Sequence, residues 1–301
     1  MTTHGHRATI SRNVTTRVRE SLVNSPQSAQ RHPIVFSIVV LIGAALLVDW
    51  ALERHALEMI TYLGAVVLSA VIVDVSVAFL EKPRIDFPVR APRAEVMVAA
   101  VLYFAAAAVL AFRFSSWFPV HGLWLRVLFA AGMFLFGLQI LLALFLFWRG
   151  FSLRDLGLRL WGFAPVPLVM ACCMGLVALT MPLRNAWVEN YHSIGGSIWA
   201  WVQVGLLMAA LPEEFFRMVW QTRLGKLLNN AAAGWLVGSL LWASLHSFMY
   251  AQGESHLQAL FAVLGIVPYG LLLGYITHRT RSILPAILLH ATKFVWLGNL
   301  G

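Results

Sequence analysis

Two adjacent carboxylates and an arginine lie inside a segment that is otherwise apolar. This segment reads ALPEEFFRMVW and contains Glu213, Glu214 and Arg217. Charged groups within apolar, membrane-like segments are rare and usually mark a functional site. Because Arg217 follows the two glutamates by four and three residues, it can pair with either carboxylate on one side of a helix. A carboxylate held in this way can act as a general base that takes a proton from water and later returns it.

Two histidines in later apolar segments are the candidate partners of these carboxylates. Glu213 and His246 are each about fifteen residues from a predicted turn at Asn229–Asn230. At 1.5 Å per residue, both side chains lie about 22 Å from the turn on antiparallel helices, so they can face each other. His290 follows a predicted loop by only about eight residues, which places it about 10 Å shallower in an ideal helix. Either that last helix begins deeper, or His290 lies outside the site.

A buried ion pair that fixes helix packing is the alternative explanation for the charged segment. Such a pair needs only one carboxylate, and the second one adds a desolvation cost. Pairing therefore explains Arg217 better than it explains both glutamates. Two further acidic residues in or near apolar runs, Asp49 and Asp74, each stand alone, and helix-end solvation or a structural hydrogen bond accounts for them.

Composition indicates that a membrane protein must position these residues. The chain is 60% hydrophobic and only 12% charged, whereas soluble domains carry about a quarter charged residues. The net charge of +9 comes from Lys and Arg that lie between apolar runs, which favours a lipid bilayer as partner and argues against nucleic acid. The two cysteines are adjacent, and the chain has no H-E-x-x-H or nucleotide-binding signature, so we expect neither a metal nor another cofactor.

The apolar runs predict an all-α fold, a polytopic membrane helical bundle with about nine transmembrane helices, or eight as the alternative. They span residues 34–52, 59–80, 96–112, 125–148, 163–182, 198–220, 231–250, 257–277 and 283–299. The amino-terminal tail and every second loop hold 16 Lys and Arg, against three in the remaining loops. Because short cytoplasmic loops are enriched in these residues, we expect a multi-pass protein of the cytoplasmic (inner) membrane with a cytoplasmic amino terminus.

Three regions follow from this pattern. Residues 1–33 form a basic cytoplasmic tail, and residues 34–120 form accessory transmembrane helices with few intramembrane polar groups. Residues 121–301 form the functional core, because the last four predicted helices contain nearly all the intramembrane polar chemistry.

Three short motifs in the core carry a family resemblance. They read EEFFRMVWQTRL, WASLH and HATKF, and they are similar to EExxxR, FxxxH and HxxxN. With these motifs the chain resembles the CPBP family, the CAAX protease and bacteriocin-processing group that is also called Abi. The resemblance covers about residues 121–301 and implies a CPBP-like core in the C-terminal part of the chain.

The resemblance also implies an activity and a role for each candidate residue. The activity is that of a glutamate-dependent intramembrane endopeptidase that works without metal. Glu213 or Glu214 would be the base, and His246 its partner in activating water. His290 would donate a hydrogen bond to the oxyanion, and Arg217 would organise the carboxylates.

The chain departs from the family motifs in three places. Only two residues separate the glutamates from Arg217, where the family has three. If Arg217 is the fixed point, Pro212 takes the place of the first glutamate. If the glutamates are fixed, the helix must absorb a one-residue deletion, and Pro212 can distort it. Met218 replaces the glycine that usually follows the arginine, and Phe294 replaces the asparagine of HxxxN.

These observations lead to a first hypothesis and two alternatives. The first is an intramembrane endopeptidase that hydrolyses a peptide bond of a membrane-associated protein or peptide substrate. The second is a catalytically impaired family member that acts as a membrane scaffold or chaperone, because Phe294 cannot donate a hydrogen bond and losing one oxyanion donor costs about 10²–10³ in rate. The third is a proton-coupled transporter, which the lack of matched helix-breaking segments in two halves disfavours.

Overall fold

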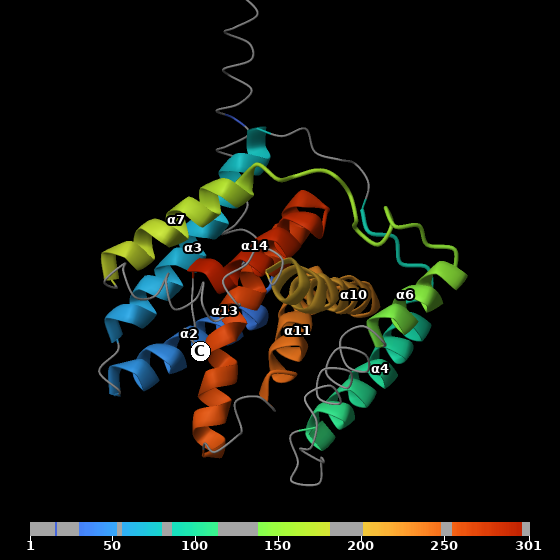
Figure 1. Cartoon of the computed structure of the whole chain (residues 1–301), viewed down its shortest axis with the longest axis horizontal. Coiled ribbons are helices and arrows are strands. Elements are labelled where there is room, and N and C mark those ends of the chain that lie inside the picture. The colour runs from blue at the N-terminus through green and yellow to red at the C-terminus, as the bar shows by residue number, and fades with distance from the viewer. Residues whose placement is uncertain are drawn as a thin grey trace, which may run out of the picture.

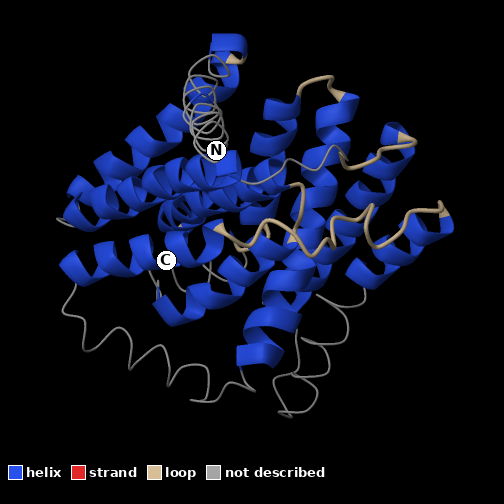
Figure 2. Cartoon of the chain, turned by 90° about the horizontal axis from the view of Figure 1, so that it is seen from above, coloured by secondary structure: helices blue, strands red, loops and turns tan. Residues whose placement is uncertain are grey.

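The computed structural model describes residues 30–52, 56–79, 86–113, 138–180, 201–247 and 255–296, together with Thr16. Within these ranges all regular structure is helical and there is no strand, as Figure 2 shows. The helices are α2 (Pro33–Leu52), α3 (Ala56–Phe79), α4 (Pro92–Arg113), α6 (Leu138–Trp148), α7 (Pro165–Thr180), the π-helix η2 (Trp201–Ala210), α10 (Leu211–Leu227), α11 (Ala231–Ser244), α13 (His256–Thr280) and α14 (Leu284–Trp296). The all-α prediction is therefore confirmed for the described part of the chain.

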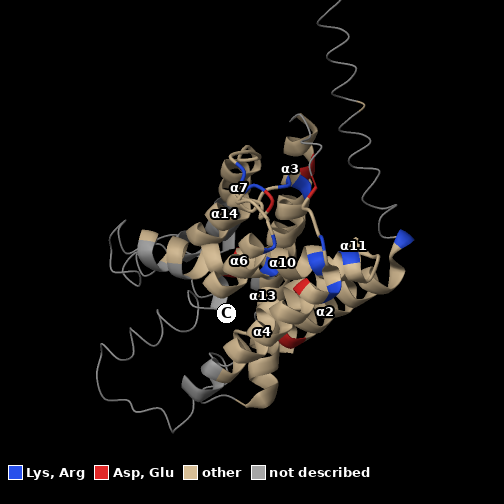
Figure 3. Cartoon of the chain, turned by 90° about the vertical axis from the view of Figure 1, so that its right-hand side faces the viewer, with Lys and Arg blue, Asp and Glu red and all other residues tan. Residues whose placement is uncertain are grey.

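Several helices are suited to a lipid environment. Among the described residues, α2, the Met59–Phe79 part of α3 and α13 are long and apolar enough to cross a membrane, and α11 is a shorter apolar helix. The count of nine or eight transmembrane helices stays a prediction, since residues 114–137 and 181–200 lie outside the described ranges. Figure 3, in which Lys and Arg are blue and Asp and Glu are red, shows that charged residues occupy only short parts of the helices.

The outer surfaces of α2, α3 and α4 carry large apolar side chains. On α4 these lie at positions 97, 101 and 104, the spacing of one helix face. Soluble proteins rarely expose apolar patches of this extent, whereas lipid explains them, so this is a membrane protein. The exposed residues include Val40, Leu41, Val48, Val67, Met97, Val101 and Phe104.

Helix α14 belongs to both hydrophobic clusters of the core. In Figure 1, α13 and α14 lie at the centre, with α2, α3 and α7 to one side and α4 and α6 to the other. One face of α14 contributes Ala286 and Leu289 to the cluster formed mainly by α3, α11 and α13. Another face contributes Ile287 and Ala291 to the cluster formed mainly by α4, α6 and α10. The helix that carries His290 is therefore held from two sides.

Helices α10 and α11 form a tight hairpin around glycines. A Cβ atom at Gly234 would lie 2.4 Å from both Gln221 O and Gly225 N, so the two backbones touch there, as small residues allow in membrane helices. The side chain of Asn230 accepts a hydrogen bond from Ala233 N at 3.0 Å and caps α11. The predicted turn at Asn229–Asn230 is confirmed, and the close contact fixes how far each helix is shifted against the other.

The turn between α13 and α14 is buried beneath the segment that joins α6 to α7. Ser282 Oγ donates to Arg159 O at 2.7 Å, and Ile283 N donates to Gly157 O at 2.9 Å. Both Ser282 and Ile283 are fully buried. Helix α14 therefore begins inside the protein rather than at its rim.

Helices of the predicted accessory region bind the core through buried polar contacts. Arg223 Nε on α10 donates to Glu95 Oε2 on α4 at 2.9 Å, and both side chains are fully buried. Asp74 on α3 accepts from Tyr275 at 2.6 Å and pairs with Arg279 at 2.7 Å, which fits the structural role considered for it. The division of the chain into the regions 34–120 and 121–301 remains a prediction.

Helix α13 contains an internal proline. A tyrosine hydroxyl from α3 binds the backbone of α13 beside this proline. Pro268 has no N–H to donate within the helix. Tyr62 Oη donates to Gly265 O at 2.9 Å and accepts from Tyr269 N at 3.2 Å. An unbroken α-helix joins these two backbone groups directly. The hydroxyl of α3 thus bridges the hydrogen-bond ladder of α13 next to its proline.

We expect the substitution Tyr62→Phe to lower the free energy of unfolding by about 1–2 kcal/mol, because two backbone groups lose a shared partner. Thermal unfolding of the purified protein in detergent measures the loss. Tyr103→Phe is the matched control, since Ser244 Oγ, which contacts Tyr103 Oη at 2.7 Å, keeps its bond to Leu241 O. Equal losses in the two variants would show that the hydroxyl bridge has no special role.

Candidate active site

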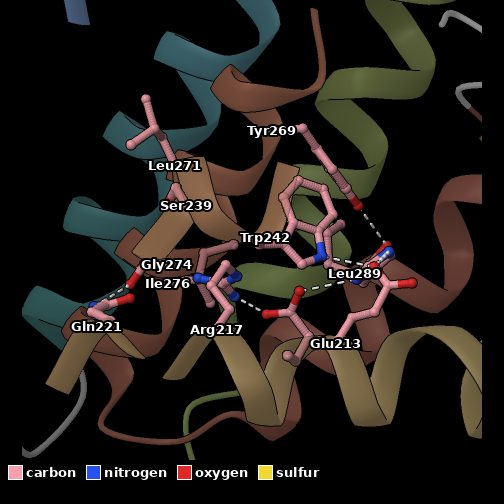
Figure 4. Close-up of polar contacts among 12 residues, drawn as sticks. Glu213, Arg217, Gln221, Ser239, Trp242, Tyr269, Leu271, Gly274, Ile276 and Leu289 are labelled. Carbon is pink, nitrogen blue, oxygen red and sulfur yellow. Dashed lines mark hydrogen bonds and ion pairs between the residues drawn. The ribbon is translucent and has the colours of Figure 1, made fainter. Parts of the chain in front are cut away.

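The structure brings the five predicted site residues into one group, named here the carboxylate–histidine cluster. Glu213, Glu214 and Arg217 lie on the first half of α10, His246 lies just after α11, and His290 lies on α14. Contacts within the cluster and around it are drawn in Figure 4. Three elements that are separated in sequence therefore meet at this place.

The partly accessible side of the cluster consists of Glu213 and His246. Glu213 Oε2 lies 3.6 Å from His246 Nε2, and the two side chains are 17% and 21% exposed. His246 Nδ1 lies 3.2 Å from Trp242 O; because a carbonyl oxygen only accepts, we assign the ring proton to Nδ1. Nε2 then presents a lone pair. Two proton acceptors thus lie near each other, at a separation longer than a direct hydrogen bond.

The buried side of the cluster consists of Glu214, Arg217 and His290. His290 Nδ1 lies 2.9 Å from Glu214 Oε1, so we assign this nitrogen as the donor. The guanidinium of Arg217 contacts the other oxygen, Glu214 Oε2. Glu214 and Arg217 are fully buried and His290 is almost so. Each oxygen of Glu214 therefore has a donor beside it.

The contacts of His290 decide between the two alternatives left open for it and place it in the cluster. Counting from the predicted loop placed it about 10 Å too shallow, whereas His290 contacts Glu214 directly and its Nε2 lies 3.8 Å from Glu213 Oε2. The reason is the buried turn described above, because α14 starts beneath the α6–α7 segment instead of at the surface of the protein. His290 therefore lies between the two glutamates.

The short spacing between the glutamates and the arginine coincides with a change of helix type. The π-helix η2 ends at Ala210 and α10 begins at Leu211, next to Pro212. A proline removes one ladder donor, and π-turns are frequent at functional sites. Glu213 faces His246 while Glu214 pairs with Arg217. This geometry favours the alternative in which the helix, and not the glutamates, absorbs the missing residue.

The other two departures from the family motifs are Met218 and Phe294. Met218 is fully buried, and its sulfur lies 3.6 Å from Arg223 Nη1. The side chain of Phe294 lies outside those that the structure describes.

Two aromatic residues in contact with the cluster were not identified from the sequence as site residues. Trp242 Nε1 donates to Glu213 Oε2 at 2.7 Å. Tyr269 Oη donates to Leu289 O at 3.1 Å, and its ring meets that of His290 edge-on at 6.0 Å. Trp242 could have been found, because it is the aromatic residue of WASLH and lies one turn before His246. Tyr269 lies in no motif, and only the fold places it there.

A glycine on α13 makes room for the buried arginine. A Cβ atom at Gly274 would lie 2.6 Å from Arg217 Nη1 and 2.9 Å from Gln221 Oε1. Gln221 Nε2 in turn donates to Gly274 O at 3.1 Å. Among the described residues, Arg217 Nε and Nη1 have no hydrogen-bond partner. The buried charge of Arg217 is therefore paired with Glu214.

A comparison with protein families identifies the segment that carries the cluster. Residues 193–293 match the family model described as Type II CAAX prenyl endopeptidase Rce1-like, and all five cluster residues fall within the match. Neither the curated proteins nor the solved structures contain a match to the chain. Residues 193–293 are therefore similar to the Rce1-like proteases, in agreement with the resemblance of the motifs to the CPBP group.

Proposed function

We propose that the protein is an intramembrane endopeptidase in which Glu213 and His246 activate a water molecule to hydrolyse a peptide bond of a membrane-associated protein. The observation that carries this proposal is the 3.6 Å separation of Glu213 Oε2 and His246 Nε2 on the accessible side of the cluster. A water about 2.8 Å from both atoms can direct one hydrogen to each. The family match supports the protease class and a protein substrate.

The cluster supplies a group for each proton movement of the reaction. Glu213 takes a proton from the water as the water oxygen attacks the peptide carbonyl carbon. The carbonyl electron pair moves onto its oxygen, and this oxyanion needs a donor. His290 already donates through Nδ1 to Glu214, so a second proton on Nε2, which makes the ring cationic, supplies the donor to the oxyanion. When the oxyanion collapses, the C–N bond breaks and Glu213 gives its proton to the leaving amine.

The donors around the carboxylates support a base rather than a metal ligand. Glu213 Oε2 accepts from the Trp242 indole, Glu214 Oε1 faces His290 Nδ1, and Glu214 Oε2 contacts Arg217. A metal would have to displace these donors from the oxygens. A metal-independent glutamic mechanism follows as part of the proposal.

We further propose the cytoplasmic (inner) membrane as the location, with the amino terminus in the cytoplasm. The alternation of Lys and Arg between loops supports this orientation. Residues 121–301 would then form the protease core, and residues 34–120 the accessory helices of a bundle of about nine spans.

The substitution His246→Ala tests the proposal. His246 is partly exposed and its described hydrogen bond goes to a backbone carbonyl, so we expect the variant to fold. The termini of membrane proteins are compared by mass spectrometry in cells that express the wild type, His246→Ala, or the control His256→Ala, which changes an exposed histidine at the start of α13. New termini should appear with the wild type and the control and be absent with His246→Ala. Identical termini in all three would overturn the proposal.

The second candidate function is that of a membrane scaffold or chaperone without catalysis. Phe294 at the motif asparagine favours it, because phenylalanine supplies no oxyanion donor. In that case His246→Ala would retain a cellular phenotype that deletion of the gene removes.

A further inference from the structure

We propose that Trp242 is a positioning residue for Glu213, holding through its indole N–H the carboxylate oxygen that faces His246. This role rests on the proposed function, because it concerns the same water-activating pair. Trp242 does not itself touch the substrate carbonyl in the proposed reaction. It acts through the orientation of Glu213.

The hydrogen bond of Trp242 goes to the oxygen on which the proposed chemistry depends. Trp242 Nε1 lies 2.7 Å from Glu213 Oε2. The same oxygen lies 3.6 Å from His246 Nε2 and 3.8 Å from His290 Nε2. The indole is the nearest of these three groups and always carries its proton. It therefore holds the carboxylate whatever the protonation of the histidines, and Figure 4 shows it directed at Glu213.

The same residue also orients the histidine of the pair. Its carbonyl oxygen lies 3.2 Å from His246 Nδ1, which leaves Nε2 turned towards Glu213. The side chain of Trp242 thus binds one member of the pair while its backbone binds the other. A single rigid residue sets the distance between the base and its partner.

The indole ring has little freedom to turn away. Trp242 is only 2% exposed. A Cβ atom at Gly270 would lie 2.7 Å from Trp242 Cε3 and 2.8 Å from Cζ3, so α13 packs directly on the ring. The rings of His246 and His290 meet it edge-on at 4.9 and 5.8 Å. The direction of the N–H is therefore fixed by packing.

The donor is a feature of this chain's version of the motif. The similar motif FxxxH has phenylalanine at this position, whereas the chain has tryptophan. Phenylalanine fills part of the same space but has no N–H. The substitution Trp242→Phe therefore removes the donor and tests its role.

We expect Trp242→Phe to lower kcat about 10- to 100-fold, because a small displacement of a catalytic group can cost about 100-fold in rate. KM should stay unchanged, since Trp242 does not bind substrate. Initial rates are measured with the full-length protein in lipid, on a substrate identified from the cellular termini.

The matched control is Trp235→Phe. Trp235 lies on the same helix and donates its indole N–H to Leu271 O at 2.8 Å, away from the carboxylates. This variant loses an indole hydrogen bond of the same kind, yet we expect wild-type kcat and KM. A merely structural role for Trp242 would make the two variants alike.

Three outcomes separate this inference from the proposed function. If His246→Ala cleaves as well as the wild type, the proposed function fails, and the inference with it. If His246→Ala is inactive while Trp242→Phe keeps wild-type kcat, only the inference fails. Should Trp242→Phe not fold, benzothienylalanine placed at residue 242 keeps the ring shape without the N–H, and an unchanged kcat would then overturn the inference.

Discussion

Replacing Glu213 by glutamine is expected to lower kcat by about 10²–10⁴-fold, the usual contribution of a general base, while the protein stays folded. Glu213 is partly exposed and faces His246, and the amide oxygen of glutamine can still accept the indole hydrogen bond of Trp242. The change therefore removes proton acceptance but little packing. Initial rates of cleavage and thermal unfolding in detergent measure the two effects separately.

Glu214→Gln is the matched control for this prediction, because it makes the same chemical change one residue away. Glu214 is fully buried between Arg217 and His290. Removing the negative charge of Glu214 should reduce the free energy of unfolding strongly, since Arg217 keeps its positive charge without a counter-charge. If Glu213→Gln retained wild-type kcat and Glu214→Gln lost it at unchanged stability, the two glutamates would have to exchange roles.

Replacing Arg217 by methionine is expected to lower the free energy of unfolding by about 3–5 kcal/mol, the usual cost of breaking a buried ion pair. Glu214 would keep His290 as a donor but would lose the guanidinium at Oε2. Methionine fills similar apolar space, so the loss reflects the buried charge rather than a cavity. Unfolding of the purified protein by heat or denaturant in detergent provides the measurement.

The double variant Arg217→Met, Glu214→Gln separates the effect of the unpaired charge on stability from the effect of altered packing. Removing both charges should recover most of the stability, because neutral replacement of a buried pair is often nearly neutral, and the departure from additivity measures their coupling. Arg154→Met, at an exposed arginine, should stay within about 0.5 kcal/mol of the wild type. A loss in Arg217→Met no larger than in Arg154→Met would show that the ion pair does not stabilise the fold.

The sequence alone was sufficient for the features that depend on local regularity. Apolar runs predicted a helical membrane protein, and most described helices begin and end close to those runs. The exceptions are α10, which ends at Leu227 beyond the predicted end at 220, and α11, which ends at Ser244 before the predicted end at 250. The meeting of Glu213 and His246 was also predictable. Their helices are joined by a short turn, and a constant rise of 1.5 Å per residue then fixes their relative depth.

The tertiary structure decided the features that depend on contacts between distant segments. His290 reaches the cluster because the α13–α14 turn is buried beneath the α6–α7 segment, which no count along one helix can reveal. The choice of Glu214 as the partner of Arg217 depends on helix rotation next to Pro212. The Trp242 indole and the Tyr62 hydroxyl bind where other helices place their acceptors. Periodicity specifies each helix, but rotation, tilt and starting depth arise only when the helices pack together.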